Sequence, residues 1–227
     1  MKLLRDPLGR PIKRLYFTAE ELDERCERKI ADFMNDHCGG FRLPVPTDDI
    51  VRMIEVDTDD LDLYANLPEG VDAHTDYFID RNPRVKVAAR LSDPRYENRL
   101  RTTLAHEYGH VWLHAPLWRK PASESDRRPA ARSWRCERET IVTAPDNDWM
   151  EWQAGYVCGA LLMPRTEIVL LANAIASRNS TNLPLRSDTE AVPELIAQVM
   201  RRCRVSEQAA RIRLARLMVV SEVEAGR

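Results

Sequence analysis

The chain lacks the sequence features that usually mark secreted, disulfide-bonded and membrane proteins. Its first residues, MKLLRDPLGRPIKRL, hold no continuous apolar run, which argues against a signal peptide or a membrane span. Its five cysteines are odd in number and none forms a C-x-x-C pair, which argues against a disulfide framework or a cysteine-built zinc ribbon. We therefore expect a cytoplasmic protein with reduced thiols and no membrane contact.

The sequence also lacks a strong overall charge. A net charge of -2 gives no general attraction to nucleic acid or to anionic lipid. The charge is nevertheless uneven, because residues 48–62 hold seven acidic residues and one arginine, whereas residues 199–217 hold six arginines and one glutamate. We interpret both stretches as solvated faces and expect no direct nucleic-acid binding.

Apolar side chains make up 44% of the 227 residues, enough for a chain of this length to bury its own core. Apolar periodicity and capping signals predict helices over residues 18–38, from residue 47, and over residues 97–115, 150–163, 193–203 and 206–219. Short β-rich pieces at residues 77–79 and 85–87 predict a small sheet before the third helix. The pattern indicates an α+β fold that is mainly helical.

The segment between the third and fourth predicted helices, residues 116–148, is rich in proline, serine and arginine and has no clear period. We interpret it as a long loop or insertion that contains a short strand at Thr140–Val142. Such a loop could alter access or the choice of partner.

The motif HEYGH places His106 and His110 four residues apart, so that on a helix both imidazoles project from one side and can grip one ion. Three of the five histidines fall between residues 106 and 114, which an ordinary polar helix face would not explain. Glu107 is better placed to act as general base on a water than as a third ligand. Gly109, inside the helix, suggests the close approach of another segment.

A hydrolytic zinc site usually has three protein ligands, so a third must lie elsewhere. His114 follows on what looks like the same unbroken helix, and we assign it a packing, second-shell or substrate-polarising role. Cys136 could supply an inhibitory thiolate but is better interpreted as a free cysteine. Glu151 opens an apolar helix and needs a compensating partner, which could be the ion or the helix N-terminus; the residues leave these two interpretations open. Zinc suits these ligands, although manganese or iron would also fit.

Two separate motifs, NRLRTTLAHEYGHVWLH and MEWQAGYVCGALLMP, resemble the ImmA/IrrE metallopeptidases. The resemblance implies metal ligation by His106, His110 and Glu151, with Glu107 as general base. It also implies a zincin-like fold of the gluzincin type, in which the small sheet packs on the active-site helix. The substrate it implies is a helix-turn-helix transcriptional repressor, which the enzyme would cleave as an endopeptidase.

We expect three regions: an N-terminal extension at residues 1–40, a metallopeptidase domain at residues 41–185, and a C-terminal helical region at residues 186–227 that docks the substrate or a partner. The competing hypothesis is a non-enzymatic regulator that binds DNA or a protein and whose metal is structural. In that case Arg211, Arg213 and Arg216 would face phosphates. A purely structural zinc site would, however, need four protein ligands and no adjacent base.

Overall fold

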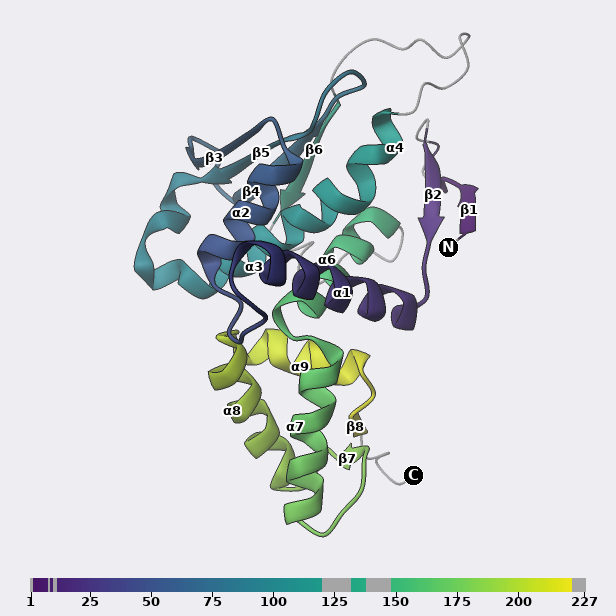
Figure 1. The fold of residues 1–227 in the computed structure, drawn as a ribbon, viewed down its shortest axis with the longest axis vertical. Helices are drawn as coiled ribbons and strands as arrows, with labels where there is room; N and C mark the ends of the chain where they lie inside the picture. Colours follow the sequence, from purple (N-terminus) through teal and green to yellow (C-terminus); the bar gives the residue numbers. More distant parts are fainter. Residues whose placement is uncertain (1, 8, 10–11, 120–131, 138–147, 222–227) are drawn as a thin grey trace.

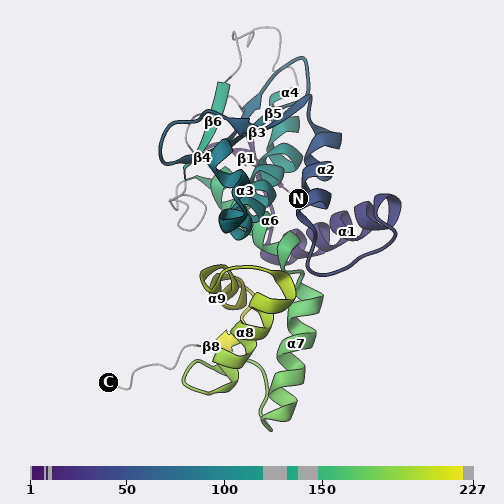
Figure 2. The ribbon, with the colours of Figure 1, turned by 90° about the vertical axis from the view of Figure 1, so that its left-hand side faces the viewer.

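The structure is a computed structural model that describes residues 2–7, 9, 12–119, 132–137 and 148–221, with residues 132–137 as backbone only. It stacks two parts along the long axis of the molecule (Figure 1). One part holds the sheet with helices α1 (Ala19–His37), α2 (Thr47–Asp57) and α3 (Glu97–Gly109), and the other holds helices α7 (Arg165–Arg178), α8 (Ala191–Cys203) and α9 (Glu207–Arg216). Helix α6 (Trp149–Leu162) leads from the first part towards the second (Figure 2). The expected α+β class, mainly helical, is confirmed.

The main sheet has four strands in the order β3-β5-β4-β6. These are β3 (Asp60–Ala65), β4 (Val71–Tyr77), β5 (Arg84–Ala88) and β6 (Arg132–Glu137). Strands β3 and β5 are parallel, and the other two pairs are antiparallel. On β4, the side chains of Ala73, Thr75 and Tyr77 are buried, as expected for alternate residues on one covered face of a sheet.

The strands of the structure differ from the predicted ones in three places. The strand predicted at residues 77–79 ends at Tyr77, because the true strand lies earlier in a polar stretch whose Asp72 is buried in an ion pair with Arg99. Strand β3, which was not predicted, begins at the end of the acidic stretch, where charged side chains suit the edge of a sheet. Strand β6 interrupts the predicted 116–148 loop, whereas Thr140–Val142 lies outside the described residues.

The predicted N-terminal helices are confirmed. Thr18 caps α1 through a capping box with Glu21, and α2 begins at Thr47. The apolar faces of both helices enter the core, which includes Leu22, Ile30 and Ile54. Before α1, strands β1 (Lys2–Arg5) and β2 (Lys13–Tyr16) form an antiparallel hairpin that was not predicted, because neither strand has a buried alternating face long enough to recognise.

The helix predicted over residues 97–115 begins at Glu97 as expected, but the helical chain does not end before Pro116. After α3, residues His110–His114 form a π turn in which the N–H of Ala115 donates to the carbonyl of His110. Helix α4 (Ala115–Arg119) follows, with Pro116 in its first turn. Proline is tolerated near a helix start, where a missing N–H breaks no intrahelical bond. The expectation of one unbroken α-helix is therefore wrong at the π turn.

Helix α6 matches the predicted buried helix, but the next helix, α7 (Arg165–Arg178), was missed. Pro164 ends α6 and at the same time serves as the N-cap of α7, which shows why a proline marks a boundary without excluding helix on its far side. Within the described residues no single helix is long and apolar enough to cross a membrane; α6 and α7, bent by 60°, pass that test only as a pair.

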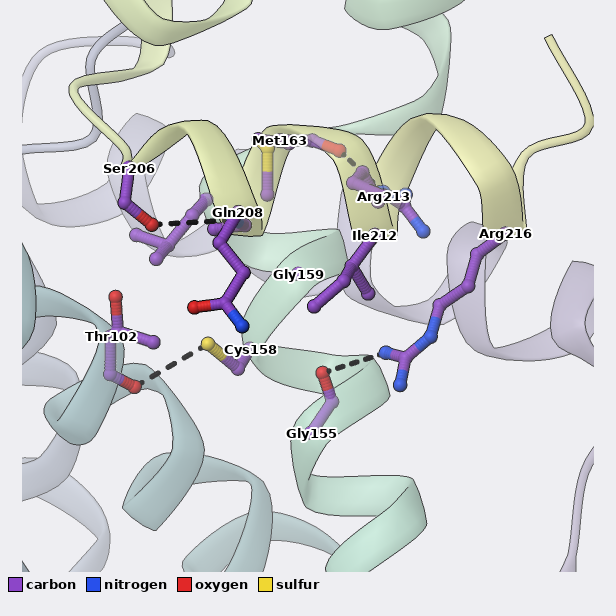
Figure 3. A pocket seen from close by; sticks show the side chains of 12 residues that line it. Thr102, Gly155, Cys158, Gly159, Met163, Ser206, Gln208, Ile212, Arg213 and Arg216 are labelled. Carbon is purple, nitrogen blue, oxygen red and sulfur yellow. Dashed lines mark hydrogen bonds between the residues drawn. The ribbon is translucent and has the colours of Figure 1, made fainter. Parts of the chain in front are cut away.

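The C-terminal helices α8 (Ala191–Cys203) and α9 (Glu207–Arg216) are confirmed, and Ser206 caps α9 as predicted. Two short strands, β7 (Leu185–Arg186) and β8 (Val220–Ser221), pair beside them. Helix α9 crosses α6, where Arg216 donates to the carbonyl of Gly155 (Figure 3). Helix α6 in turn contacts α3, where the Cys158 thiol donates to the carbonyl of Thr102. The C-terminal helix α9 is thus in direct contact with α6.

The arginine-rich stretch is not uniformly solvated, which corrects the earlier interpretation. Arg213 is 1% exposed, donates to the carbonyl of Met163, and forms a 2.6 Å ion pair with Asp23 of α1. The Asp23 carboxylate also accepts a hydrogen bond from the hydroxyl of Tyr156. Arg211, by contrast, lies exposed and pairs with Glu207 on its own helix.

We expect Arg213→Ala to lower the free energy of unfolding by about 3–5 kcal/mol, because it leaves the Asp23 carboxylate buried without its cation. Arg211→Ala on the same helix is the matched control, and its loss should be barely measurable because that pair is exposed. Urea unfolding of the two variants checks the prediction. Equal stability of both variants would mean that α9 is not integrated into the core that contains α1.

Candidate metal centre

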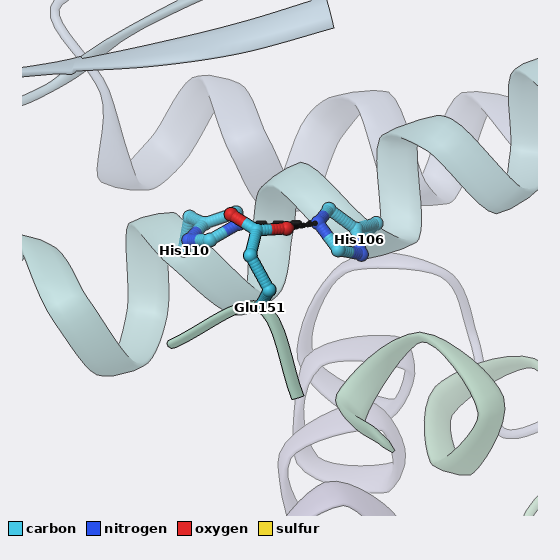
Figure 4. Close-up of side chains that lie close together, drawn as sticks. All are labelled: His106, His110 and Glu151. Carbon is cyan, nitrogen blue, oxygen red and sulfur yellow. Dashed lines mark hydrogen bonds and ion pairs between the residues drawn. The ribbon is translucent and has the colours of Figure 1, made fainter. Parts of the chain in front are cut away.

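Three buried side chains converge between α3 and α6 (Figure 4). The Nε2 atoms of His106 and His110 lie 3.1 Å apart. The Oε2 atom of Glu151 lies 3.1 Å from His106 Nε2, and its Oε1 atom lies 3.2 Å from His110 Nε2. Their exposed fractions are 0%, 1% and 3%. A search of the described residues for groups of at least three histidine, cysteine or acidic side chains that could hold an ion finds these three.

The local sequence explains how the two helices meet. His106 and His110 face the same side because they are four residues apart, and Glu151 lies in the first turn of α6, capped by Asp148. The helices approach closely at Gly109, where an added Cβ would lie 2.8 Å from the Cα of Ala154. The close approach expected at this glycine is confirmed.

Gly109→Ala should therefore force α3 and α6 apart and destabilise the protein by about 1–3 kcal/mol, in spite of alanine's better helix propensity. Gly159→Ala is the control, because an added Cβ there makes an ordinary 3.6 Å contact with Arg213 Cδ. That variant should be neutral or gain up to about 1 kcal/mol. Thermal unfolding and zinc titration of both variants test this; equal behaviour of the two would contradict the close packing.

The charges in the group support one another. Burial lowers the pKa of His110, but the nearby carboxylates of Glu151, Glu107 and Asp148 outweigh it, so that its pKa is raised. Burial raises the pKa of Glu151, but the two histidines outweigh it and hold that pKa well below its usual range. Glu151 is therefore an anion at neutral pH, which is the state in which a carboxylate binds a metal.

Glu107 is fully buried beside the group, and its two oxygens differ in their surroundings. Its Oε2 accepts a 2.6 Å hydrogen bond from the Thr75 hydroxyl of β4. Its Oε1 has no hydrogen-bond partner among the described residues. One oxygen is thus fixed by the sheet, and the other is left to accept a proton.

Of the other two candidates for third ligand, His114 does not join the group, and the side chain of Cys136 is not described. His114 is fully buried, with its Nδ1 3.0 Å from His110 Nδ1 and its Nε2 3.1 Å from Gln153 Oε1, so both ring nitrogens face other side chains. Its ring also meets Trp149 edge to face at 5.4 Å between centroids. The backbone of Cys136 lies in β6 opposite Ala73, but its side chain is outside the described part of the chain.

The ligand atoms fit an ion such as zinc. Zinc takes imidazole nitrogen and carboxylate oxygen at about 2.0–2.2 Å in a tetrahedral arrangement, whose corners are then about 3.3 Å apart. The two imidazole nitrogens lie 3.1 Å apart, and each lies 3.1–3.2 Å from a different oxygen of Glu151. With one ligand atom taken from each residue, all three atoms lie within 4.8 Å of one another. The donor set and the spacing therefore suit a small divalent ion, and manganese or iron could use the same donors.

Sequence reasoning missed Thr75 and Gln153. Thr75 lies in a strand that was placed too late in the sequence, so nothing linked it to Glu107. Gln153 stands two residues after Glu151 inside an apolar helix and is 2% exposed. A polar side chain at a buried helix position needs a partner, and this signal could have identified it.

Comparison with protein-family models identifies one domain, described as the IrrE N-terminal-like domain of a peptidase family, over residues 54–215. The matched region contains α3 and α6, and so all three residues of the candidate metal centre. No curated protein matches the chain. Because the match covers well over half of the 227 residues, the chain belongs to this family of peptidases.

Proposed function

We propose that the protein is a zinc-dependent endopeptidase of the ImmA/IrrE type, zincin-like in fold, and that it cleaves a helix-turn-helix transcriptional repressor. The observation that carries the hydrolytic part is the pairing of a three-ligand group with an adjacent buried carboxylate that keeps one oxygen without a partner among the described residues. The repressor as substrate is supported by the resemblance of the two sequence motifs. His106, His110 and Glu151 would hold the ion.

A bound zinc ion would supply Lewis acidity to the scissile carbonyl and acidify the attacking water. Glu107 would accept the proton of that water on Oε1 and then deliver it to the leaving amine. Thr75 would keep the carboxylate in place through its 2.6 Å hydrogen bond to Oε2. The closure of the group by β4 and α6 would exclude bulk water, as the burial of all three ligands suggests.

The competing hypothesis of a DNA-binding regulator has less support. It needs Arg211, Arg213 and Arg216 to face phosphates, but Arg213 is 1% exposed and paired with Asp23. Arg216 is part-buried and donates to the carbonyl of Gly155. Of these three arginines, Arg211 alone is exposed, and it pairs with Glu207 on its own helix. We therefore expect no specific binding to duplex DNA.

The test is to identify the product of the neighbouring gene and to incubate it with the purified protein and zinc. We expect one discrete cut, lost on chelation and restored by added zinc. The parallel measurement is binding to duplex DNA at several salt concentrations, since true DNA binding weakens steeply with salt. An intact partner after incubation with fully zinc-loaded enzyme would contradict the substrate assignment, and salt-dependent DNA binding would favour the competing hypothesis.

A further inference from the structure

The N-terminal hairpin of β1 and β2 lies outside the family match, yet it and the adjoining Asp6 contact α6 on either side of Glu151. Two buried hydrogen bonds attach it to α6. The indole N–H of Trp149 donates to Asp6 over 2.6 Å, and the amide Nε2 of Gln153 donates to the carbonyl of Leu15 over 2.6 Å. Trp149 and Gln153 stand two residues before and two residues after Glu151, and both contact His114.

A series of hydrogen bonds runs from Leu15 through Gln153 and His114 to His110, and the donor and acceptor of each bond are fixed. The Leu15 carbonyl can only accept, so the amide nitrogen of Gln153 must face it and the amide oxygen must face His114. That oxygen can only accept, so His114 must carry a proton on Nε2. A neutral His114 then has a bare Nδ1, which lies 3.0 Å from His110 Nδ1.

The same logic fixes His110. A bare Nδ1 on His114 accepts the proton of His110 Nδ1, so that neutral His110, the form that binds a metal, has no proton on Nε2. This is the nitrogen that faces His106 and Glu151, and a metal ligand must present a lone pair there. With the opposite tautomer, His110 would point an N–H at the ion.

We propose that Gln153 and His114, held by the Leu15 carbonyl, are positioning residues that set the tautomer of His110, and that the N-terminal hairpin is thereby part of the metal centre. The inference rests on the proposed function in one respect, namely that an ion binds between His106, His110 and Glu151. The complete chain of contacts is buried, since Leu15, Gln153, His114 and His110 are 9%, 2%, 0% and 1% exposed. Water therefore cannot easily replace a missing link.

The test compares Gln153→Met with Gln198→Met in the full-length protein. Gln198 is the matched control, because its amide donates only to Glu194 on its own helix α8 among the contacts of the described chain. Zinc affinity, measured by competition with a chelator, should fall about 10–100-fold in Gln153→Met, the usual loss when an outer partner of a ligand is removed. Gln198→Met should bind zinc as the wild type does.

A double-mutant cycle separates positioning from general damage. If Gln153 acts through His114, Gln153→Met should cause no further loss of zinc affinity in a His114→Met background. Additive losses in the cycle would overturn the proposal, as would unchanged affinity in Gln153→Met.

A second readout needs no zinc. In the metal-free wild type, nitrogen chemical shifts of the imidazoles should report a proton on Nε2 of His114 and on Nδ1 of His110. The opposite tautomers would overturn the proposal whether or not the protein binds zinc. If the wild type showed these tautomers but failed to bind zinc, the proposed function would fail while the tautomer assignment stood.

Discussion

Glu107→Gln should abolish peptide hydrolysis and leave zinc binding intact. The amide cannot take a proton from the attacking water, and the loss of a general base typically lowers a rate by about 10²–10⁴-fold. None of the three candidate ligands is changed, and glutamine can still accept the hydrogen bond from Thr75. The measurement is cleavage of the partner protein, with the zinc content determined on the same samples.

Glu97→Gln serves as the control for this variant. Glu97 begins the same helix, before the HEYGH motif, and its carboxylate accepts a hydrogen bond from the Thr47 hydroxyl of α2. Its cleavage rate should match that of the wild type. Wild-type rates in Glu107→Gln would show that another group is the base.

Glu151→Ala should weaken zinc binding by more than about 100-fold, because removal of a direct ligand should exceed the effect of an outer partner. The protein should also lose cleavage. Because Glu151 and the two histidines come from different helices, zinc should raise the melting temperature of the wild type but not that of this variant.

The other two candidate ligands, Cys136 and His114, provide the controls for Glu151. Cys136→Ser should keep both zinc and activity. His114→Ala should keep the ion at saturating zinc even if its affinity and rate fall, since His114 contacts His110 from behind. Full zinc occupancy in Glu151→Ala, together with loss in either control, would transfer the third-ligand role to the other residue.

The parts of the site that could be predicted share a local cause. His106, Glu107 and His110 lie on one helix, where spacing alone fixes which side chains face together. Glu151 comes from a helix far along the chain, so the sequence left its role open between an ion and a helix terminus. The structure brings its carboxylate to both histidines, and the resemblance to the metallopeptidases points the same way.

The parts that could not be predicted depend on contacts between distant segments. Thr75 reaches Glu107 across 32 residues, and Gln153 reaches Leu15 across 138. Arg213 was interpreted as solvated because its neighbours are charged, yet its partner Asp23 lies 190 residues earlier. No local pattern encodes such pairs, although each leaves a weak signal as a polar residue on an otherwise apolar helix face.

The fold shows the same division. Helices α1, α2 and α3 begin close to where capping and periodicity predict, because these signals act within a few residues. Strand β4 was misplaced because Asp72, His74 and Asp76 obscure its pattern, and the burial of Asp72 depends on Arg90 and Arg99 from later segments. The division into residues 1–40, 41–185 and 186–227 remains a prediction.

The most direct measurement of the central claim is anomalous diffraction at the zinc edge from crystals of the zinc-loaded protein. We predict one strong peak at about 2.0–2.2 Å from Nε2 of His106, Nε2 of His110 and a carboxylate oxygen of Glu151. A peak whose third protein ligand is His114 or Cys136 in place of Glu151, or no peak between α3 and α6, would contradict the account.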